Sequence, residues 1–248
     1  GLDRFEARKL LVSRLKEKGC LKKIETIKNK VPFGDRSNSI IEPLLTEQWF
    51  VNAKKLSLKP IKIVHQGKTS FFPANWTKIF YQWMRDIEPW CISRQIWWGH
   101  RIPAWYDESE NIFVAENEKI ALDLARKKNK KKIVKLKQET DVLDTWFSSA
   151  LWPFATLGWP NKTTELKKFY PTSVLVTGFD IIFFWVARML MMGNFFNKNT
   201  PFQKVYVHAL VRDEKGQKMS KSKGNVIDPL ELINEYGADS LRFTLISM

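Results

Sequence analysis

The chain has 248 residues, enough to bury the core of one large domain or of two modest ones. It carries 41 lysine and arginine residues against 26 aspartate and glutamate residues. The formal net charge of +15 favours a polyanionic partner such as RNA, although part of the excess lies in the solvated run 126–132. Cys20 and Cys91 lie far apart, which excludes a disulfide framework and a cysteine metal quartet and fits a reducing compartment such as the cytoplasm. No apolar run reaches the roughly 18 residues that a membrane span requires.

The N-terminal residues 3–18 carry the pattern of an amphipathic helix. Its apolar residues recur at helical spacing: Phe5, Leu11 and Leu15. Asp3 is placed to cap the first turn, Glu6 completes a capping box, and Gly19 is typical of a helix end. Because the chain starts at Gly1 and residues 240–248 stop within an uncapped apolar helix, we expect an internal piece of a longer protein.

The central part of the chain is rich in tryptophan. A turn-rich passage at 31–38 predicts a domain boundary between residues 35 and 36, and the run 61–64 predicts a strand. Residues 76–85 predict a helix with an aromatic stripe that faces the core: Ile79, Phe80, Trp83 and Met84. Residues 107–140 are predicted to form a lysine-rich insertion, with a helix at 116–128 and then a strand or a loop.

Trp97 and Trp98 are neighbours and precede Gly99. Two adjacent tryptophans cannot both face one core, so one of them is free to wall a pocket. For Trp98, and likewise for Trp146, ordinary core packing is the alternative.

The run 173–177 is short and β-branched, which predicts a buried strand that ends at Gly178. A helix follows, with apolar residues at helical spacing: Ile181, Phe184, Trp185, Met189 and Met192. This order of elements places Asp180 at a helix N-terminus on the carboxyl edge of a sheet, where it is suited to capping. His208 ends the next predicted strand, which lies in the β-branched and aromatic run 204–210, and a lone histidine is usually a satisfied core or surface group.

A basic loop follows that strand. Lys218 and Lys221 are three residues apart, lie close to Ser220 and Ser222, and are flanked by Gly216 and Gly224. Asp228 and Pro229 then open a helix. A loop at the carboxyl end of a strand in an open α/β sheet lies where such sheets bind ligands. Its ammonium, hydroxyl and backbone N–H groups suit a polyphosphate, whereas a solvated lysine-rich turn is the alternative.

Four segments together resemble the class I aminoacyl-tRNA synthetases. Residues 218–222, with Gly224-Asn225 after them, resemble the second signature of that class. Residues 92–106, 141–149 and 177–189 are more similar to the valyl-tRNA synthetases than to the isoleucyl or leucyl enzymes. The resemblance covers the whole chain.

The resemblance implies an α/β fold, namely the second half of a Rossmann-type domain with a parallel sheet at 36–248, after the end of an editing domain at 1–35. It implies ATP and Mg²⁺ carried by ATP, with Lys218 and Lys221 as catalytic residues. It assigns ATP contacts to Gly178, Asp180, His208, Met219, Ser220 and Ser222. Many relatives carry a Cys-x-x-Cys zinc knuckle near 31–38; this sequence has none, so no zinc is expected.

The resemblance also implies an amino-acid pocket between Trp98 and Trp146, sized for valine. A hydrophobic pocket rejects isosteric threonine only about a hundredfold, so an editing site is needed. There Asp3 would hold the ammonium of a wrongly attached amino acid. The implied partners are valine, ATP and the cognate tRNA, the implied parent is a cytoplasmic monomer, and no membrane is involved.

Three alternatives remain open. The first is an isoleucyl-tRNA synthetase, and the second is a non-catalytic basic RNA-binding protein that keeps synthetase motifs. The third is a fragment with no independent fold. The first signature of the class, His-x-Gly-His, does not occur in this sequence, so we expect the chain by itself to be inactive.

Overall fold

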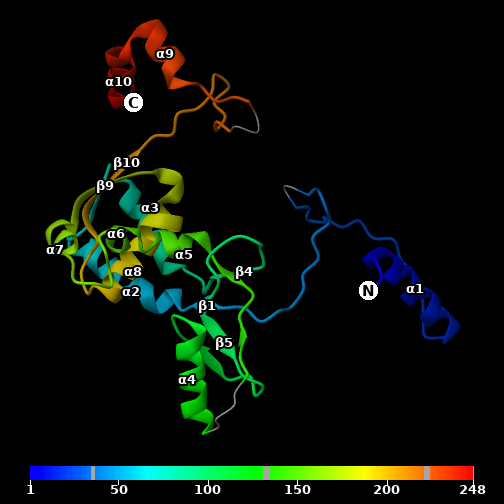
Figure 1. Ribbon diagram of the computed structural model, residues 1–248. Coiled ribbons are helices and arrows are strands. Elements are labelled where there is room, and N and C mark those ends of the chain that lie inside the picture. Colours follow the sequence, from blue (N-terminus) through cyan, green and yellow to red (C-terminus); the bar gives the residue numbers. More distant parts are fainter. Residues whose placement is uncertain (35–36, 131–134, 221–223, 248) are drawn as a thin grey trace. The chain divides into compact units, whose positions relative to one another are not determined.

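The computed structural model describes residues 1–34, 37–130, 135–220 and 224–247 (Figure 1). The chain forms two compact units, Gly1–Glu47 and Gln48–Met248. The predicted domain boundary at 35/36 falls inside the first unit, at residues outside the described ranges, and it stays a prediction.

The first unit is built on helix α1 (Arg4–Glu17), which confirms the helix predicted at 3–18. Asp3 caps it: Oδ1 accepts hydrogen bonds from the N–H groups of Phe5 (2.9 Å) and Glu6 (3.4 Å). The carboxylate of Glu6 binds Lys9 Nζ at 3.0 Å. The apolar residues of this helix remain exposed within the described unit, so the predicted amphipathic face has no core beneath it here: Phe5, Leu11 and Leu15.

The second unit is organised on a parallel three-stranded sheet. Its strand order is β2 (Ser70–Phe72), β10 (Phe202–His208) and β9 (Thr172–Gly178), with β10 parallel to both neighbours. This arrangement confirms the predicted parallel α/β sheet and the strands that end at Gly178 and near His208. It also puts the carboxyl ends of β9 and β10 at one edge, because His208 lies opposite Gly178 in the register.

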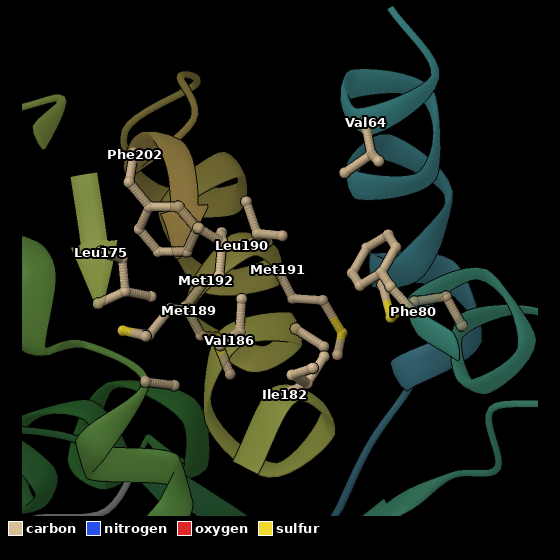
Figure 2. Packing of buried hydrophobic residues seen from close by; sticks show 14 of the residues in the cluster. Val64, Phe80, Leu175, Ile182, Val186, Met189, Leu190, Met191, Met192 and Phe202 are labelled. Atoms are coloured by element: carbon tan, nitrogen blue, oxygen red, sulfur yellow. The ribbon is translucent and has the colours of Figure 1, made fainter. Parts of the chain in front are cut away.

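The core lies between the sheet and three helices, α2 (Ala53–His65), α3 (Trp76–Arg85) and α8 (Arg188–Phe196). Figure 2 shows how α8 fills it. Leu175 and Phe202 of the sheet lie on one side of the α8 side chains, and Phe80 and Val64 lie on the other. Phe80, Met189 and Leu190 are fully buried.

Short pieces complete the second unit. Antiparallel pairs join β1 (Phe50–Val51) to β3 (Trp90–Cys91) and β4 (Ser93–Arg94) to β8 (Val142–Leu143). The short helices are α5 (Thr145–Ser149), α6 (Trp152–Ala155) and α7 (Thr164–Phe169). Helices α9 (Pro229–Tyr236) and α10 (Ala238–Ser247) follow the basic loop, and Asp228 caps α9 as predicted, accepting from Leu230 N at 2.9 Å.

The strand predicted at 61–64 is wrong, because these residues lie in α2. The helix begins at Asn52, whose side chain accepts a hydrogen bond from Lys55 N at 3.0 Å. Its buried residues recur at helical spacing: Ala53, Ser57, Pro60, Ile63 and Val64. A four-residue stretch with three apolar residues fits a strand or a helix equally well. Pro60 obscures the continuity of the helix, because proline usually breaks a helix interior.

Helix α3 and strand β9 were both predicted to pack in the core, but each buries only one of its faces. Helix α3 has the predicted bounds and buries Phe80 and Met84, but Ile79 is 37% and Trp83 is 52% exposed. The ring of Trp83 stacks on Phe183 at 4.8 Å instead of entering the core. In β9, Leu175 is buried while Val174 and Val176 are exposed, because helices cover one face of the described sheet.

The predicted helix after Gly178 forms as three pieces: a 3-10 turn η1 (Phe179–Ile181), a π-helix η2 (Ile182–Ala187) and α8. The continuous segment Phe179–Phe196 is long and apolar enough to cross a membrane by length and composition alone. The sequence count missed it because Asp180 and Arg188 interrupt the run. More than half of the segment is buried inside the protein, as the core helix of a globular domain is.

The insertion is a small antiparallel sheet of β6 (Ile112–Val114), β5 (Ala104–Tyr106) and β7 (Lys137–Gln138), packed on α4 (Glu118–Asn129). The helix predicted at 116–128 is confirmed within two residues. The insertion has a separate small core: Trp105, Phe113, Ala121 and Ala125.

Asp107 stabilises this insertion through hydrogen bonds that depend on the ionisation of its carboxyl group. Its carboxylate accepts hydrogen bonds from Asn129 Nδ2 (2.7 Å), Asn111 N (2.9 Å) and Ser109 N (2.9 Å). The bond from Asn129 is the main reason that the pKa of Asp107 falls from 3.8 to about 2, against the opposing effect of burial. Since the pKa is lowered on folding, this stabilisation is complete above pH 3.8 and is lost as the pH falls through about 2.

We therefore expect the side-chain amide NMR signals of Asn111 and Asn129 to shift along one titration curve with its midpoint near pH 2. The variant Asp107→Asn should remove this transition. A midpoint at 3.8 would show that the hydrogen bonds do not favour the carboxylate.

Candidate functional site

The carboxyl edge of the sheet brings Gly178, Asp180, His208 and Leu210 together. A Cβ atom built at Gly178 would lie 2.8 Å from Asp180 Oδ1, 3.2 Å from Leu210 Cδ2 and 3.7 Å from His208 Cε1. Gly178 has an ordinary φ of −75°, so space and not backbone strain requires glycine here. His208 is exposed, and its Nδ1 lies 2.7 Å from the carbonyl oxygen of Ala209.

Asp180 binds the basic loop. Lys218 Nζ donates a hydrogen bond to Asp180 Oδ2 at 2.8 Å, across 38 residues of chain. The interpretation of Asp180 as a helix cap is wrong, because Gly178 occupies the cap position and Asp180 sits within the first turn. The side chains of Lys218 and Asp180 are 69% and 32% exposed, so solvent screens their attraction to about 1 kcal/mol or less. Such a pair is easily opened by a ligand.

The base of the loop is held by hydrogen bonds of Asp213 and Asn225, neither of which was assigned a role from the sequence. Asp213 Oδ1 accepts from the N–H groups of Lys215 (3.0 Å) and Gln217 (2.6 Å), and Asn225 Nδ2 donates to Asp213 Oδ2 at 2.7 Å. Asn225 Oδ1 accepts from Ser220 N at 2.8 Å. The sequence did contain a signal for these two residues, because an aspartate and an asparagine stand at the two ends of a glycine-flanked loop.

Four more residues of the loop were predicted to act in catalysis or in ATP binding, and the structure describes two of them, Met219 and Ser220. Met219 Sδ accepts a hydrogen bond from Ile227 N at 3.4 Å, and the N–H of Ser220 is held by Asn225. Lys221 and Ser222, predicted as a catalytic and an ATP-binding residue, lie outside the described residues.

Trp146 and Trp98 stand in different surroundings. Trp146 is partly buried, and its ring stacks on Phe184 at 5.9 Å. Trp98 is 90% exposed, and among the described ring pairs none joins it to Trp146. The predicted pocket between the two indoles stays a prediction.

A buried ion pair holds the segment that carries Trp146. Asp144 caps α5, and its Oδ2 accepts from Trp90 Nε1 at 2.9 Å and from Arg188 NH1 at 3.3 Å. The guanidinium of Arg188 lies 3.9 Å from the centre of the Trp90 ring. Burial lowers the pKa of Arg188 to about 10, although the charge of Asp144 opposes the shift. The sequence signal for this pair was a lone arginine in an apolar helix.

Two other predicted features can be placed. Asp3 is the cap of α1 in the first unit, and its editing role stays a prediction. In the described ranges, no group of three or more His, Cys, Asp or Glu side chains is arranged to hold a metal ion. The expectation of no zinc remains a prediction from the sequence.

Comparison with known proteins decides the family. The model of the family described as tRNA synthetases class I (I, L, M and V) matches residues 5–248. The chain belongs to the class I tRNA synthetases. This synthetase chain is 69% identical over 248 residues to a valine-tRNA ligase of Pelagibacter ubique and 60% identical over 248 residues to that of Caulobacter vibrioides. Both alignments cover 100% of the chain, which spans about 28% and 27% of the length of these relatives.

Solved structures of the class share the fold of this synthetase chain. Mycobacterium tuberculosis methionyl-tRNA synthetase bound by methionyl-adenylate gives a TM-score of 0.57 at 18% identity, covering 87% of this chain and 36% of that one. A ternary complex of a leucyl-tRNA synthetase from Agrobacterium radiobacter K84 gives 0.51 at 20% identity, covering 66% and 26%. The predicted class I synthetase fold is therefore confirmed.

Proposed function

We propose that this chain is one half of the catalytic domain of a valine-tRNA ligase, namely the half whose basic loop closes over ATP. The full-length protein, meaning the chain together with the parts that its relatives carry, would activate valine with ATP and transfer it to the cognate tRNA. The observation that supports the proposal is the 2.8 Å contact between Lys218 and Asp180, because a single nucleotide bound at the Gly178 turn would then also touch the basic loop. The relatives named above support valine over the isoleucyl alternative.

In this proposal Asp180 accepts hydrogen bonds from the ribose hydroxyls of ATP. Gly178 lets the sugar approach the backbone, since its missing Cβ leaves the space beside Asp180 and His208 open. Lys218 then leaves Asp180 for the phosphates, where a −3 or −4 charge attracts it more strongly than one carboxylate does. The exchange of partners would close the loop as the nucleotide binds.

The chemical step needs positioning and charge neutralisation. A carboxylate oxygen of valine attacks the α-phosphorus of ATP, the bond to the β-phosphate oxygen breaks, and pyrophosphate leaves with the electron pair. Lys218 and Lys221 stabilise the charge that builds on the leaving group, and Mg²⁺ arrives with ATP. A hydroxyl of the terminal tRNA ribose then attacks the carbonyl carbon of valyl-adenylate and releases AMP.

Valine selection would use the aromatic segment around Trp146, with Trp98 as the second wall. Trp146 is stacked on Phe184 and anchored through Asp144, so one wall is rigid before valine arrives. Asp3 would serve editing in the part of the protein that precedes the catalytic half. We place the parent in the cytoplasm as a monomer, without membrane contact.

The proposal is tested by ATP–pyrophosphate exchange with the full-length protein. We expect exchange that depends on valine, with threonine supporting it roughly a hundredfold less well. Exchange driven equally by isoleucine would favour the isoleucyl alternative. Absence of exchange with every amino acid would favour the RNA-binding alternative.

A substitution at Gly178 tests the nucleotide contact. Gly178→Ala puts a methyl group 2.8 Å from Asp180 Oδ1, so the carboxylate has to move. We expect KM for ATP to rise about tenfold or more, because small misplacements of positioning groups have large kinetic effects, while KM for valine stays unchanged. Steady-state exchange kinetics measure both constants. Val176→Ala, on the exposed face of the same strand, is the control and should leave KM for ATP unaltered.

A further inference from the structure

Both tryptophans predicted for the valine pocket are attached to one stretch of backbone, 139–146. Trp146 stands at the end of this stretch, in α5. Trp98 is followed by Gly99, and a Cβ atom built at Gly99 would lie 2.9 Å from Cγ2 of Val142. The loop that carries Trp98 therefore lies directly against the stretch, and the placement of both indoles depends on it.

Glu139 holds the beginning of this stretch with four hydrogen bonds. Its Oε2 accepts from Trp49 Nε1 at 3.1 Å and from the hydroxyl of Tyr106 at 2.6 Å. Its Oε1 accepts from the backbone N–H groups of Thr140 at 2.7 Å and Asp141 at 3.2 Å. The carboxylate thereby joins three parts of the second unit, namely the residue before β1, strand β5 and the stretch 139–146.

This bonding pattern requires a carboxylate. Burial raises the pKa of Glu139, but the hydrogen bonds from Tyr106 and Trp49 outweigh this effect and keep the pKa below its ordinary 4.5. The ionised group only accepts hydrogen bonds, and all four groups around it donate. A glutamine would turn its NH2 group toward two donors. The tyrosine hydroxyl can rotate and accept from that group, whereas the indole N–H of Trp49 only donates.

The hydrogen bonds continue from Glu139 to the loop of Trp98. Asp141, whose N–H is held by Glu139, accepts at Oδ2 from Gln95 Nε2, 2.6 Å away. Gln95 stands three residues before Trp98 in the chain. Glu139 thus fixes one end of the loop through Asp141, while Gly99 contacts β8 at the other end.

We propose that Glu139 is a positioning residue for valine selection, which holds the loop of Trp98 at the distance from Trp146 that a valine side chain fills. This role rests on the ligase function proposed above. Trp146 is held separately by Asp144, at the far end of the stretch. Loss of the Glu139 bonds therefore displaces Trp98 more than Trp146 and widens the pocket. A residue that only stabilised the fold would alter the kinetic constants for ATP and valine together.

ATP–pyrophosphate exchange by the full-length protein, driven by valine or by isoleucine, tests this role. We expect Glu139→Ala to raise KM for valine about tenfold and to leave KM for ATP within about twofold, because only the amino-acid wall is misplaced. The preference for valine over isoleucine should fall about fivefold or more, since a displaced wall admits the extra methylene. Glu116→Ala, which removes an exposed carboxylate from the insertion, is the control and should alter none of these values.

A pair of milder variants keeps the test decisive if Glu139→Ala folds poorly. Glu139→Gln should raise KM for valine about threefold, because the indole N–H of Trp49 loses its acceptor, and the same substitution in a Trp49→Phe background should have little further effect. An unchanged KM for valine in the Glu139 variants, an equal rise of both KM values, or an effect of glutamine that does not depend on Trp49 would overturn this role alone. Absence of valine-dependent exchange in the unaltered protein would overturn the ligase function and this role together.

Discussion

Lys218→Ala and Lys221→Ala are each expected to lower valine-dependent ATP–pyrophosphate exchange by roughly a hundredfold to a thousandfold in the full-length protein. The expected size is that of removing one preorganised group that stabilises transition-state charge. Lys218 Nζ binds Asp180 at 2.8 Å, so its loss also removes the contact that holds the loop beside the proposed nucleotide site. Valine binding, measured by quenching of tryptophan fluorescence, should change little because neither lysine lies in the predicted valine pocket.

Lys215→Ala is the matched control for these variants. Lys215 belongs to the same loop, and Asp213 holds its backbone N–H, not its ammonium group, at 3.0 Å. Its removal should therefore change exchange less than twofold. A comparable loss in Lys215→Ala would mean that total loop charge governs the rate. An unchanged rate in Lys218→Ala would remove this residue from the catalytic assignment.

The elements nearest the site were the most predictable from sequence. The strand before Gly178, the strand before His208 and the helix after Asp228 were predicted because each combines a local apolar pattern with a turn or cap residue at its end. Their meeting at one sheet edge follows from parallel pairing, which a β-x-β order with a helical crossover nearly dictates. The contact of Lys218 with Asp180 could thus be anticipated.

Contacts between distant segments were not predictable in the same way. Ile79 and Trp83 belong to the apolar stripe of α3, yet their exposure depends on how wide a surface the neighbouring helices cover. Val174 and Val176 read as core residues, but a parallel sheet is buried on both faces only when elements cover both.

The pairing of Asp144 with Arg188 joins segments 44 residues apart and has no local pattern. The sequence shows only that each residue interrupts an apolar stretch. The two charges stabilise each other because both side chains are only 9% exposed, and an unpaired charge would be costly at such a buried position. Such pairs become visible only when the packing of the helices is known.

Asp144→Ala is accordingly expected to destabilise the packing around α8 by about 3–5 kcal/mol, the usual consequence of leaving one partner of a buried ion pair uncompensated. Arg188 would keep its charge beside the Trp90 ring, and Trp90 Nε1 would lose its acceptor at 2.9 Å. Native-state hydrogen exchange of the amides of residues 188–196 in the full-length protein measures the loss locally, without requiring the whole protein to unfold in one step.

Two further variants separate the charge from the packing. Asp123→Ala removes a carboxylate from an exposed pair with Arg126 on α4 and should cost less than about 0.5 kcal/mol. Adding Arg188→Met to Asp144→Ala should restore part of the lost protection, because it removes the more buried of the two cations that pair with Asp144; the other, Arg94, is 40% exposed. If the double variant exchanged faster than Asp144→Ala alone, the arginine would be stabilising α8 through its contacts with the aromatic rings and not through the ion pair.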